Sequence, residues 1–285
     1  MTKRTEAAWI RRTLIAVALG FLALFIFLPL CVVFSAALNQ GIAVYAKSFV
    51  EPDALAAIRL TLLSAFIAVP LNLVFGIAAS WAITKFDFWG KNFLITLIDL
   101  PLSVSPVISG LTYALLFGAQ GALGPWLTEH GMRIMFAPPA IILVTIFVTF
   151  PMVARELIPV MKAQGSEEEE AAVTLGAGGF QTFWRVTLPN IKWGLLYGVI
   201  LCNARAMGEF GAVSVVSGHI HGRTNTLPLH IEILYNEYNF TAAFAAASLL
   251  AMLALLTLVL KSIVEFQSRA ELAGVHKIRG NADEH

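Results

Sequence analysis

The sequence predicts an all-α membrane protein with about six transmembrane helices. Of its 285 residues, 58% are hydrophobic and only 13% are charged, and the mean hydropathy is +0.77. Soluble domains carry about 25% charged residues. Here the charges cluster between long uncharged runs, and a helix needs about 20 mainly apolar residues to cross roughly 30 Å of hydrocarbon. We therefore expect residues 1–285 to form a single multi-pass membrane domain.

Six apolar runs are predicted to span the membrane. In chain order they are Thr13–Leu38, Ala57–Thr84, Asn92–Phe117, Pro139–Ala154, Trp193–Val216 and Thr241–Ile263. The first is longer than the core of about 7–15 residues in a cleavable signal peptide, so we expect it to remain as a helix. The fourth is short and is expected to extend through Ile158. The fifth contains Arg205 and Glu209, which a span tolerates when the charges face protein or water.

The distribution of Lys and Arg predicts the orientation, because cytoplasmic connections of membrane proteins are enriched in both. With the N-terminus inside, fourteen basic residues fall on cytoplasmic segments, four fall outside, and Arg205 lies within the fifth run. The cytoplasmic ones are Lys3, Arg4, Arg11, Arg12, Lys85, Lys91, Arg155, Lys162, Arg185, Lys192, Lys261, Arg269, Lys277 and Arg279; the outer ones are Lys47, Arg59, Arg133 and Arg223. Both termini and the polar insert at 165–190 are therefore expected in the cytoplasm.

The insert between the fourth and fifth runs is predicted to be a short helix-turn-helix. Ser166 is a favourable N-cap, and Glu169 would complete a capping box with it. Gly176 suits a left-handed stop of the first helix. A second helix would begin at Phe180, and Pro189 would end or redirect it. Because isolated helices of this length are marginal in water, we expect the pair to dock on another protein.

The spacing within the insert resembles the EAA loop of ABC-importer permeases. The matching residues are Glu170, Ala171, Ala172, Gly176, Leu188 and Pro189, with Val186 in place of a commoner Ile. The resemblance implies a type I importer permease with a core at 57–263, in which 165–190 is the coupling loop that docks on an ATPase subunit. The chain has no G-x-x-x-x-G-K-[ST] phosphate-binding pattern. We therefore expect it not to be an enzyme, and ATP to be hydrolysed by a partner.

The fifth run carries a second informative stretch, with polar side chains at Asn203, Arg205 and Glu209. Arg205 and Glu209 are four residues apart, so they share one helical face and are able to pair. They would form either a structural ion pair between helices or a polar patch on a translocation path, where Arg205 or Asn203 meets an anion. Of the two interpretations we favour the structural pair.

The third run contains a dense proline and serine segment at Leu100–Gly110. One interpretation is a broken or bent helix that lines a pathway with hydroxyls such as Ser103 and Ser105. The other is a packed helix whose small residues allow close contact with its neighbours. The sequence leaves both open.

The stretch from Arg205 to Ala212 resembles permeases for tetrahedral oxyanions, and the chain from about Leu55 to Val264 is similar to the CysW-type sulfate/thiosulfate permeases. This resemblance implies import across the bacterial inner membrane. It also implies a related permease as heterodimer partner, two ATP-binding subunits and a periplasmic sulfate/thiosulfate-binding protein, with membrane lipid around the spans.

Two alternatives remain beside this interpretation. The first is a permease for another oxyanion, such as molybdate or tungstate. The second is an ion-coupled secondary transporter, for which the sequence lacks the expected inverted repeat. No cofactor, metal or nucleic acid is expected, because His219 and His221 lack further ligands nearby and the chain has no basic stripe.

Overall fold

The computed structural model describes the backbone of residues 8–282 and the side chains of residues 9–266. This part of the chain is helical and contains no strand, which confirms the all-α prediction. Two residues that contribute to the predicted orientation, Lys3 and Arg4, lie outside the described residues. The side chains of Arg269, Lys277 and Arg279 do so as well.

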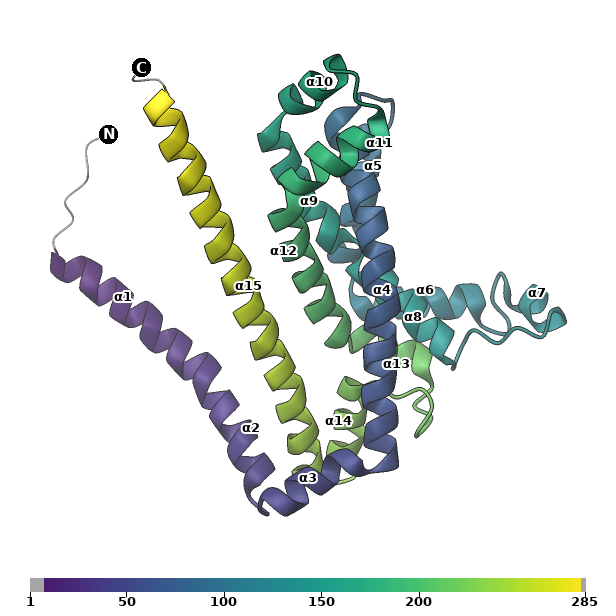
Figure 1. The fold of residues 1–285 in the computed structure, drawn as a ribbon. Coiled ribbons are helices and arrows are strands. Elements are labelled where there is room, and N and C mark those ends of the chain that lie inside the picture. Colours follow the sequence, from purple (N-terminus) through teal and green to yellow (C-terminus); the bar gives the residue numbers. More distant parts are fainter. Residues whose placement is uncertain (1–7, 283–285) are drawn as a thin grey trace.

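The described chain begins with a long arm. The arm consists of α1 (Ala8–Leu22), the π-helical turn η1 (Ala23–Phe27) and α2 (Leu28–Leu38), and α3 (Ile42–Val50) follows across its end. The most apolar window of the span Trp9–Leu38 has no residue buried in this chain. In Figure 1 the arm stands apart from the bundle and meets α15 only near α2. Its apolar side chains therefore face lipid or another polypeptide.

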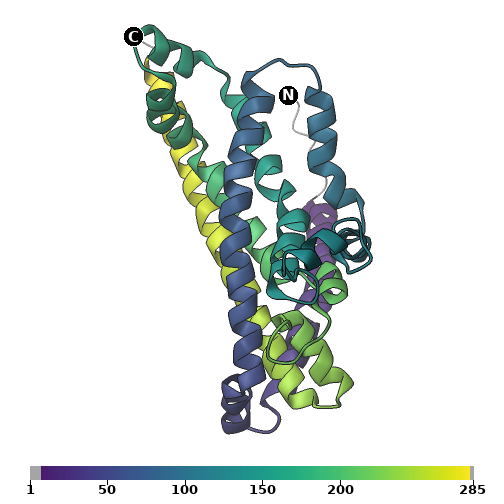
Figure 2. The same cartoon turned by 90° about the vertical axis from the view of Figure 1, so that its right-hand side faces the viewer.

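The remaining helices form a bundle around α4 (Pro52–Lys85), which runs the length of the molecule (Figure 2). It packs against α8 (Pro138–Thr149), α9 (Pro151–Gln164) and α12 (Leu188–Met207). Small residues allow membrane helices to approach closely. Gly76 does so between α4 and α9, because a Cβ on it would lie 2.6 Å from the side chain of Val153.

The predicted third span is two helices rather than one. α5 (Lys91–Ser103) and α6 (Pro106–Phe117) meet at an angle of 106°. Pro106 disfavours helical backbone at the preceding residue, and Ser105 is extended, with ψ of 135°. α6 runs sideways in Figure 1 towards α7 (Gly124–Glu129) and packs on α13 (Gly211–Ser217). A Cβ on Gly110 would lie 2.7 Å from the Ala212 carbonyl oxygen, so the helix is bent and also closely packed.

The fifth span differs from the prediction at both ends. The second insert helix, α11 (Gly179–Thr182), continues through the π-helical turn η2 (Phe183–Thr187) directly into α12. The prediction that Pro189 ends or redirects this helix is therefore wrong. The wider π turn leaves room for the proline ring and its missing N–H. At the far end, α12 stops at Met207 and α13 continues after a bend of 48°, so the predicted span Trp193–Val216 is interrupted.

The last helices are α14 (Leu227–Asn236) and α15 (Phe240–Ala282). In the described part, four helices are long and apolar enough to cross a membrane, and the two bent pairs raise this number to six. The end of α15 and the insert helix α10 (Glu167–Thr174) lie at one end of the molecule in Figures 1 and 2, while α3 lies at the other. α15 runs towards the end of the molecule that carries the insert, and the arm runs away from that end, so both ends of the described chain point to the side of the insert. This agrees with the orientation predicted from the distribution of Lys and Arg.

Candidate functional site

The first candidate site is the insert, whose first helix, α10, begins differently from the prediction. Ser166 precedes α10, but its hydroxyl does not cap the helix and instead donates to Glu170 Oε1 at 2.5 Å. Glu169 does not complete a capping box either. Its Oε2 lies 2.9 Å from Lys85 Nζ, and its Oε1 accepts a hydrogen bond from Thr187 Oγ1 at 2.7 Å. The predicted capping box is wrong because these charge-assisted contacts engage the carboxylate.

The end of α10 follows the prediction. Gly176 has a φ of +90°, which favours glycine. Its N–H donates to the Val173 carbonyl at 2.9 Å, and the N–H of Ala177 donates to the Ala172 carbonyl at 3.0 Å. This pair of bonds is the Schellman motif that ends many helices. The left-handed stop at Gly176 is therefore confirmed.

The insert exposes large apolar side chains. Leu175 is 89% exposed and Phe180 is 79% exposed, and Val173 and Trp184 are exposed beside them. Gathered apolar side chains of this kind are typical of interaction surfaces. Most of the matched motif residues are exposed, namely Glu170, Ala171, Gly176 and Pro189. Ala172 is half-buried, and Leu188 packs on the core of α9 and α12.

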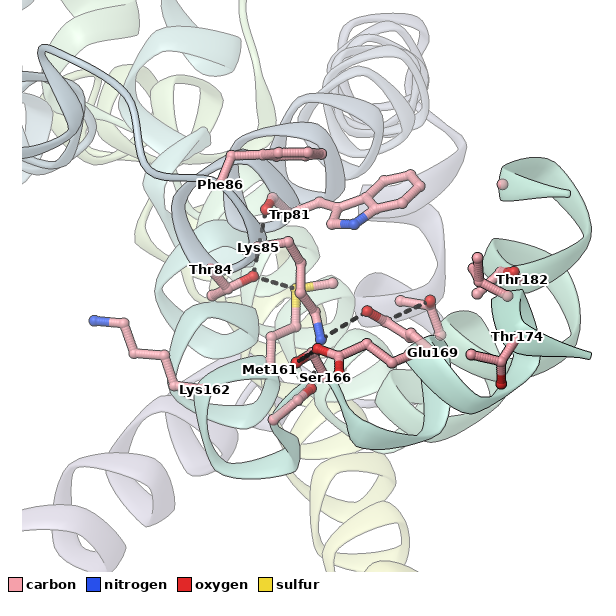
Figure 3. Close-up of a pocket in the computed structure, with 15 residues that line it drawn as sticks. Trp81, Thr84, Lys85, Phe86, Met161, Lys162, Ser166, Glu169, Thr174 and Thr182 are labelled. Carbon is pink, nitrogen blue, oxygen red and sulfur yellow. Dashed lines mark hydrogen bonds and ion pairs between the residues drawn. The ribbon is translucent and has the colours of Figure 1, made fainter. Parts of the chain in front are cut away.

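A groove of about 780 Å³ lies between the insert and the ends of α4 and α9 (Figure 3). Figure 3 shows the Lys85 side chain pointing across this groove to Glu169 and Ser166. Beside it, the rings of Trp81 and Phe183 are stacked, with centroids 4.9 Å apart. The sequence did not predict that Lys85 and Trp81 belong to this site, because no local pattern indicates which residues of the distant α4 meet the insert.

The second candidate site is the break between α12 and α13, where Glu209 is only 2% exposed. Its Oε2 lies 2.8 Å from Arg205 Nη1, and its Oε1 accepts a hydrogen bond from the backbone N–H of Ala212 at 2.9 Å. One carboxylate thus balances a cation and caps the start of α13, where the helix dipole favours negative charge. The Arg205 side chain is 36% exposed, so the pair is only partly buried.

The other polar residues predicted with this pair lie in two places. Ser103 and Ser105 are exposed at the corner of α5 and α6. The Pro106 ring beside them would lie 3.2 Å from a Cβ on Gly211, so this corner lies next to the break that holds Glu209. Asn203 instead lines a mainly apolar groove of about 620 Å³ between α4, α12 and α15.

The outer histidines face carboxylates. His219 Nε2 lies 3.8 Å from Glu232 and His221 Nδ1 lies 3.5 Å from Asp53. Burial lowers the pKa of nearby His230, although Asp53 opposes this shift. Among the residues that the structure describes, no group of three His, Cys, Asp or Glu is arranged to hold a metal ion.

Several apolar spans, two of them broken, define a multi-pass membrane protein, and large apolar side chains are exposed on its insert. The family described as binding-protein-dependent transport system inner membrane component has a sequence model that matches residues 72–270. The chain belongs to this family.

Individual relatives and a solved structure agree with this family. The chain is 52% identical to the sulfate transport system permease protein CysW of Escherichia coli (strain K12), over 91% of this chain and 89% of the relative. It is 37% identical to the sulfate transport system permease protein CysT of the same strain, over 88% of this chain and 90% of the relative. A chain of the bacterial alginate ABC transporter, solved with an alginate pentasaccharide-bound periplasmic protein, has a TM-score of 0.74 at 17% identity, over 92% and 94%. This last similarity shows a shared fold.

The Arg205–Glu209 pair generates a testable prediction. Replacing Arg205 with Ala leaves a buried carboxylate without its cation, and we expect a loss of about 3 kcal/mol of stability, at the lower end for broken buried pairs because Arg205 is partly exposed. Adding Glu209→Gln removes the charge but keeps an acceptor for Ala212, so the double variant should recover most of the loss. Thermal unfolding in detergent measures both. A double variant no more stable than Arg205→Ala would contradict the structural pair.

Proposed function

We propose that the chain is a permease subunit of an ATP-driven importer that carries sulfate or thiosulfate across the bacterial inner membrane. The observation that carries this proposal is the 52% identity to a sulfate transport system permease protein over 91% of the chain. The match covers 259 residues, which is most of the chain. It therefore favours a shared cargo as well as a shared fold.

Energy would come from two ATP-binding subunits, one of which docks on the insert of this chain. The chain has no phosphate-binding loop of its own. Its insert instead presents Leu175 and Phe180 outside the bundle, with Glu170 and Ala171 exposed on the same helix-turn-helix. Burying such apolar side chains against a partner contributes about 25 cal/mol per Å² of area removed from water. The insert is thus suited to bind a separate ATPase rather than to act alone.

A related permease would complete the membrane domain as a heterodimer, and a periplasmic binding protein would deliver the anion. The 37% identity to the CysT permease protein supports a second, homologous subunit. The exposed apolar arm Trp9–Leu38 also leaves a large surface for lipid or such a partner. The alginate transporter was solved with a periplasmic protein, which supports delivery from that side.

The translocation path would pass the point where the two broken helices meet. The corner with Ser103 and Ser105 offers hydroxyl donors, and the partly exposed Arg205 offers a cation. ATP can shift this subunit between outward- and inward-facing forms only if the loaded ATPases bind one form more tightly than the other. The insert is where that difference in affinity would act on this chain.

Labelled sulfate uptake in cells that lack this subunit tests the cargo. Expression of the chain with its partners should restore uptake, and unlabelled thiosulfate should compete because both anions are tetrahedral and divalent. Competition by molybdate without competition by thiosulfate would replace the proposed cargo with another oxyanion. Uptake that persists when ATP is depleted, but not when the ion gradient is collapsed, would indicate a secondary transporter.

The docking surface generates a second prediction. Glu170→Lys reverses a charge on the exposed face of α10, and Gly176→Val places a branched residue at a φ of +90°, which disrupts the Schellman stop. Both variants should reach the membrane but lower sulfate uptake at least about fivefold, since the loss of a single interface anchor costs more than about 1 kcal/mol. Gly178→Ala is the matched control, because Gly178 has an ordinary φ of −72° and no atom within 4 Å of a new Cβ. Normal uptake in both variants would contradict docking at the insert.

A further inference from the structure

We propose that Lys85, Glu169 and Thr187 form a clasp that makes the insert helix α10 move together with α4 and α12. The proposal rests on the function proposed above, in which α10 receives the motion of an ATPase subunit. It assigns positioning roles to three side chains on three different elements. None of them belongs to the matched coupling motif.

The clasp is centred on the Glu169 carboxylate, whose two oxygens are each engaged by a different helix. Oε2 lies 2.9 Å from the Nζ of Lys85, the last residue of α4. Oε1 accepts a hydrogen bond from the Thr187 hydroxyl at 2.7 Å, where η2 leads into α12. Lys85 Nζ also donates to the Gly165 carbonyl at 2.5 Å, just before α10. One carboxylate and one ammonium therefore fix α10 to both core helices.

The clasp is shielded from water, unlike an ordinary surface ion pair. The side chains of Lys85 and Glu169 are 11% and 19% exposed, and Thr187 is buried. Ion pairs on an exposed surface contribute little, whereas removing one partner of a shielded pair leaves the other charge without compensation. The π-helical turn η2 ends at Thr187, and π turns of this kind are frequent at functional sites.

Three further contacts connect the elements around the clasp. The ring of Trp81, one turn before the end of α4, stacks on Phe183 of η2. Asn190 of α12 donates to Glu168 of α10 and accepts from Gln164 at the end of α9. The clasp therefore lies within a connected set of contacts that joins α10 to α4, α9 and α12.

The docking residues of the insert are separate from the clasp residues. Glu170 and Val173 of α10 are exposed although they also line the groove of Figure 3, and Leu175 is exposed directly after the helix, whereas Glu169 is half-buried. Docking and transmission are thus carried by different side chains of the insert. A change in the clasp should leave ATPase binding intact and reduce the transport obtained from each ATP.

The test combines two measurements on three matched pairs of variants. The disruptive variants are Lys85→Met, Glu169→Gln and Thr187→Val, and the conservative ones are Lys85→Arg, Glu169→Asp and Thr187→Ser. In proteoliposomes with the complete importer and sulfate-loaded binding protein, the disruptive variants should lower sulfate transported per ATP about fivefold or more, a typical scale for coupling between sites. Co-purification of the ATPase subunits should be unchanged. Lys85→Arg and Thr187→Ser should keep at least half of the wild-type ratio.

A surface ion pair near the same end of the molecule is the control. Lys91 Nζ lies 2.9 Å from Asp87 Oδ1, and this hydrogen bond lowers the pKa of Asp87, but the pair joins no other helix to the insert. Asp87→Asn should leave sulfate per ATP at the wild-type value. Disruptive clasp variants that also keep the wild-type ratio would overturn the clasp.

Hydrogen exchange of the full-length chain in detergent separates the clasp from the proposed function. Glu169→Gln and Thr187→Val should speed amide exchange of residues 167–174 about fivefold, which corresponds to the roughly 1 kcal/mol of one lost hydrogen bond, while Asp87→Asn should not. A wild-type importer that moves no sulfate would overturn the proposed function and leave this result standing. Unchanged exchange in both clasp variants would overturn the clasp whatever the cargo.

Discussion

Backbone hydrogen bonding in a water-free environment is the constraint on which this architecture depends. Every helix break at membrane depth must be completed by protein, because lipid offers no donor or acceptor. At the junction of α8 and α9, Asn72 Nδ2 donates to the Ile146 carbonyl at 3.2 Å and to Thr149 Oγ1 at 2.7 Å. At the junction of α12 and α13, Glu209 supplies the acceptor for Ala212. Individual polar side chains thus bind the backbone at these two junctions, Asn72 from the neighbouring α4 and Glu209 from the junction itself.

These breaks and the insert are the two ends of one mechanical path. The insert is continuous with α12 because η2 carries the helix past Pro189, and α12 ends at the break that holds Glu209. A displacement of α10 that reaches α12 through Thr187 is therefore carried along a single helix of residues 179–207 to the corner with α6. This continuity explains how a surface outside the bilayer acts on groups deep in the bundle.

The sequence predicted the helical class, the six apolar runs, the stop at Gly176 and the exposed insert, because hydropathy, charge and glycine conformation act locally. It left the bend between α5 and α6 as one of two interpretations, and it did not predict the bend after Met207 or the continuity past Pro189, because hydropathy averages over a bend and a π turn has no simple pattern. The capping box at Ser166 failed for a different reason. Glu169 meets Lys85 and Thr187, and a partner far along the chain outcompetes a local cap without leaving a mark on the local sequence.

If the clasp holds, α10 and the end of α4 move as one rigid unit while ATP drives the importer. Spin labels at Glu167 and Phe86, both exposed, report the distance between these elements by pulsed electron paramagnetic resonance once Cys31 and Cys202 are replaced by Ser. The account predicts the same distance distribution with and without ATP, under conditions in which ATP closes the ATPase subunits. A shift of about 5 Å, one helical turn, between the two states would contradict it.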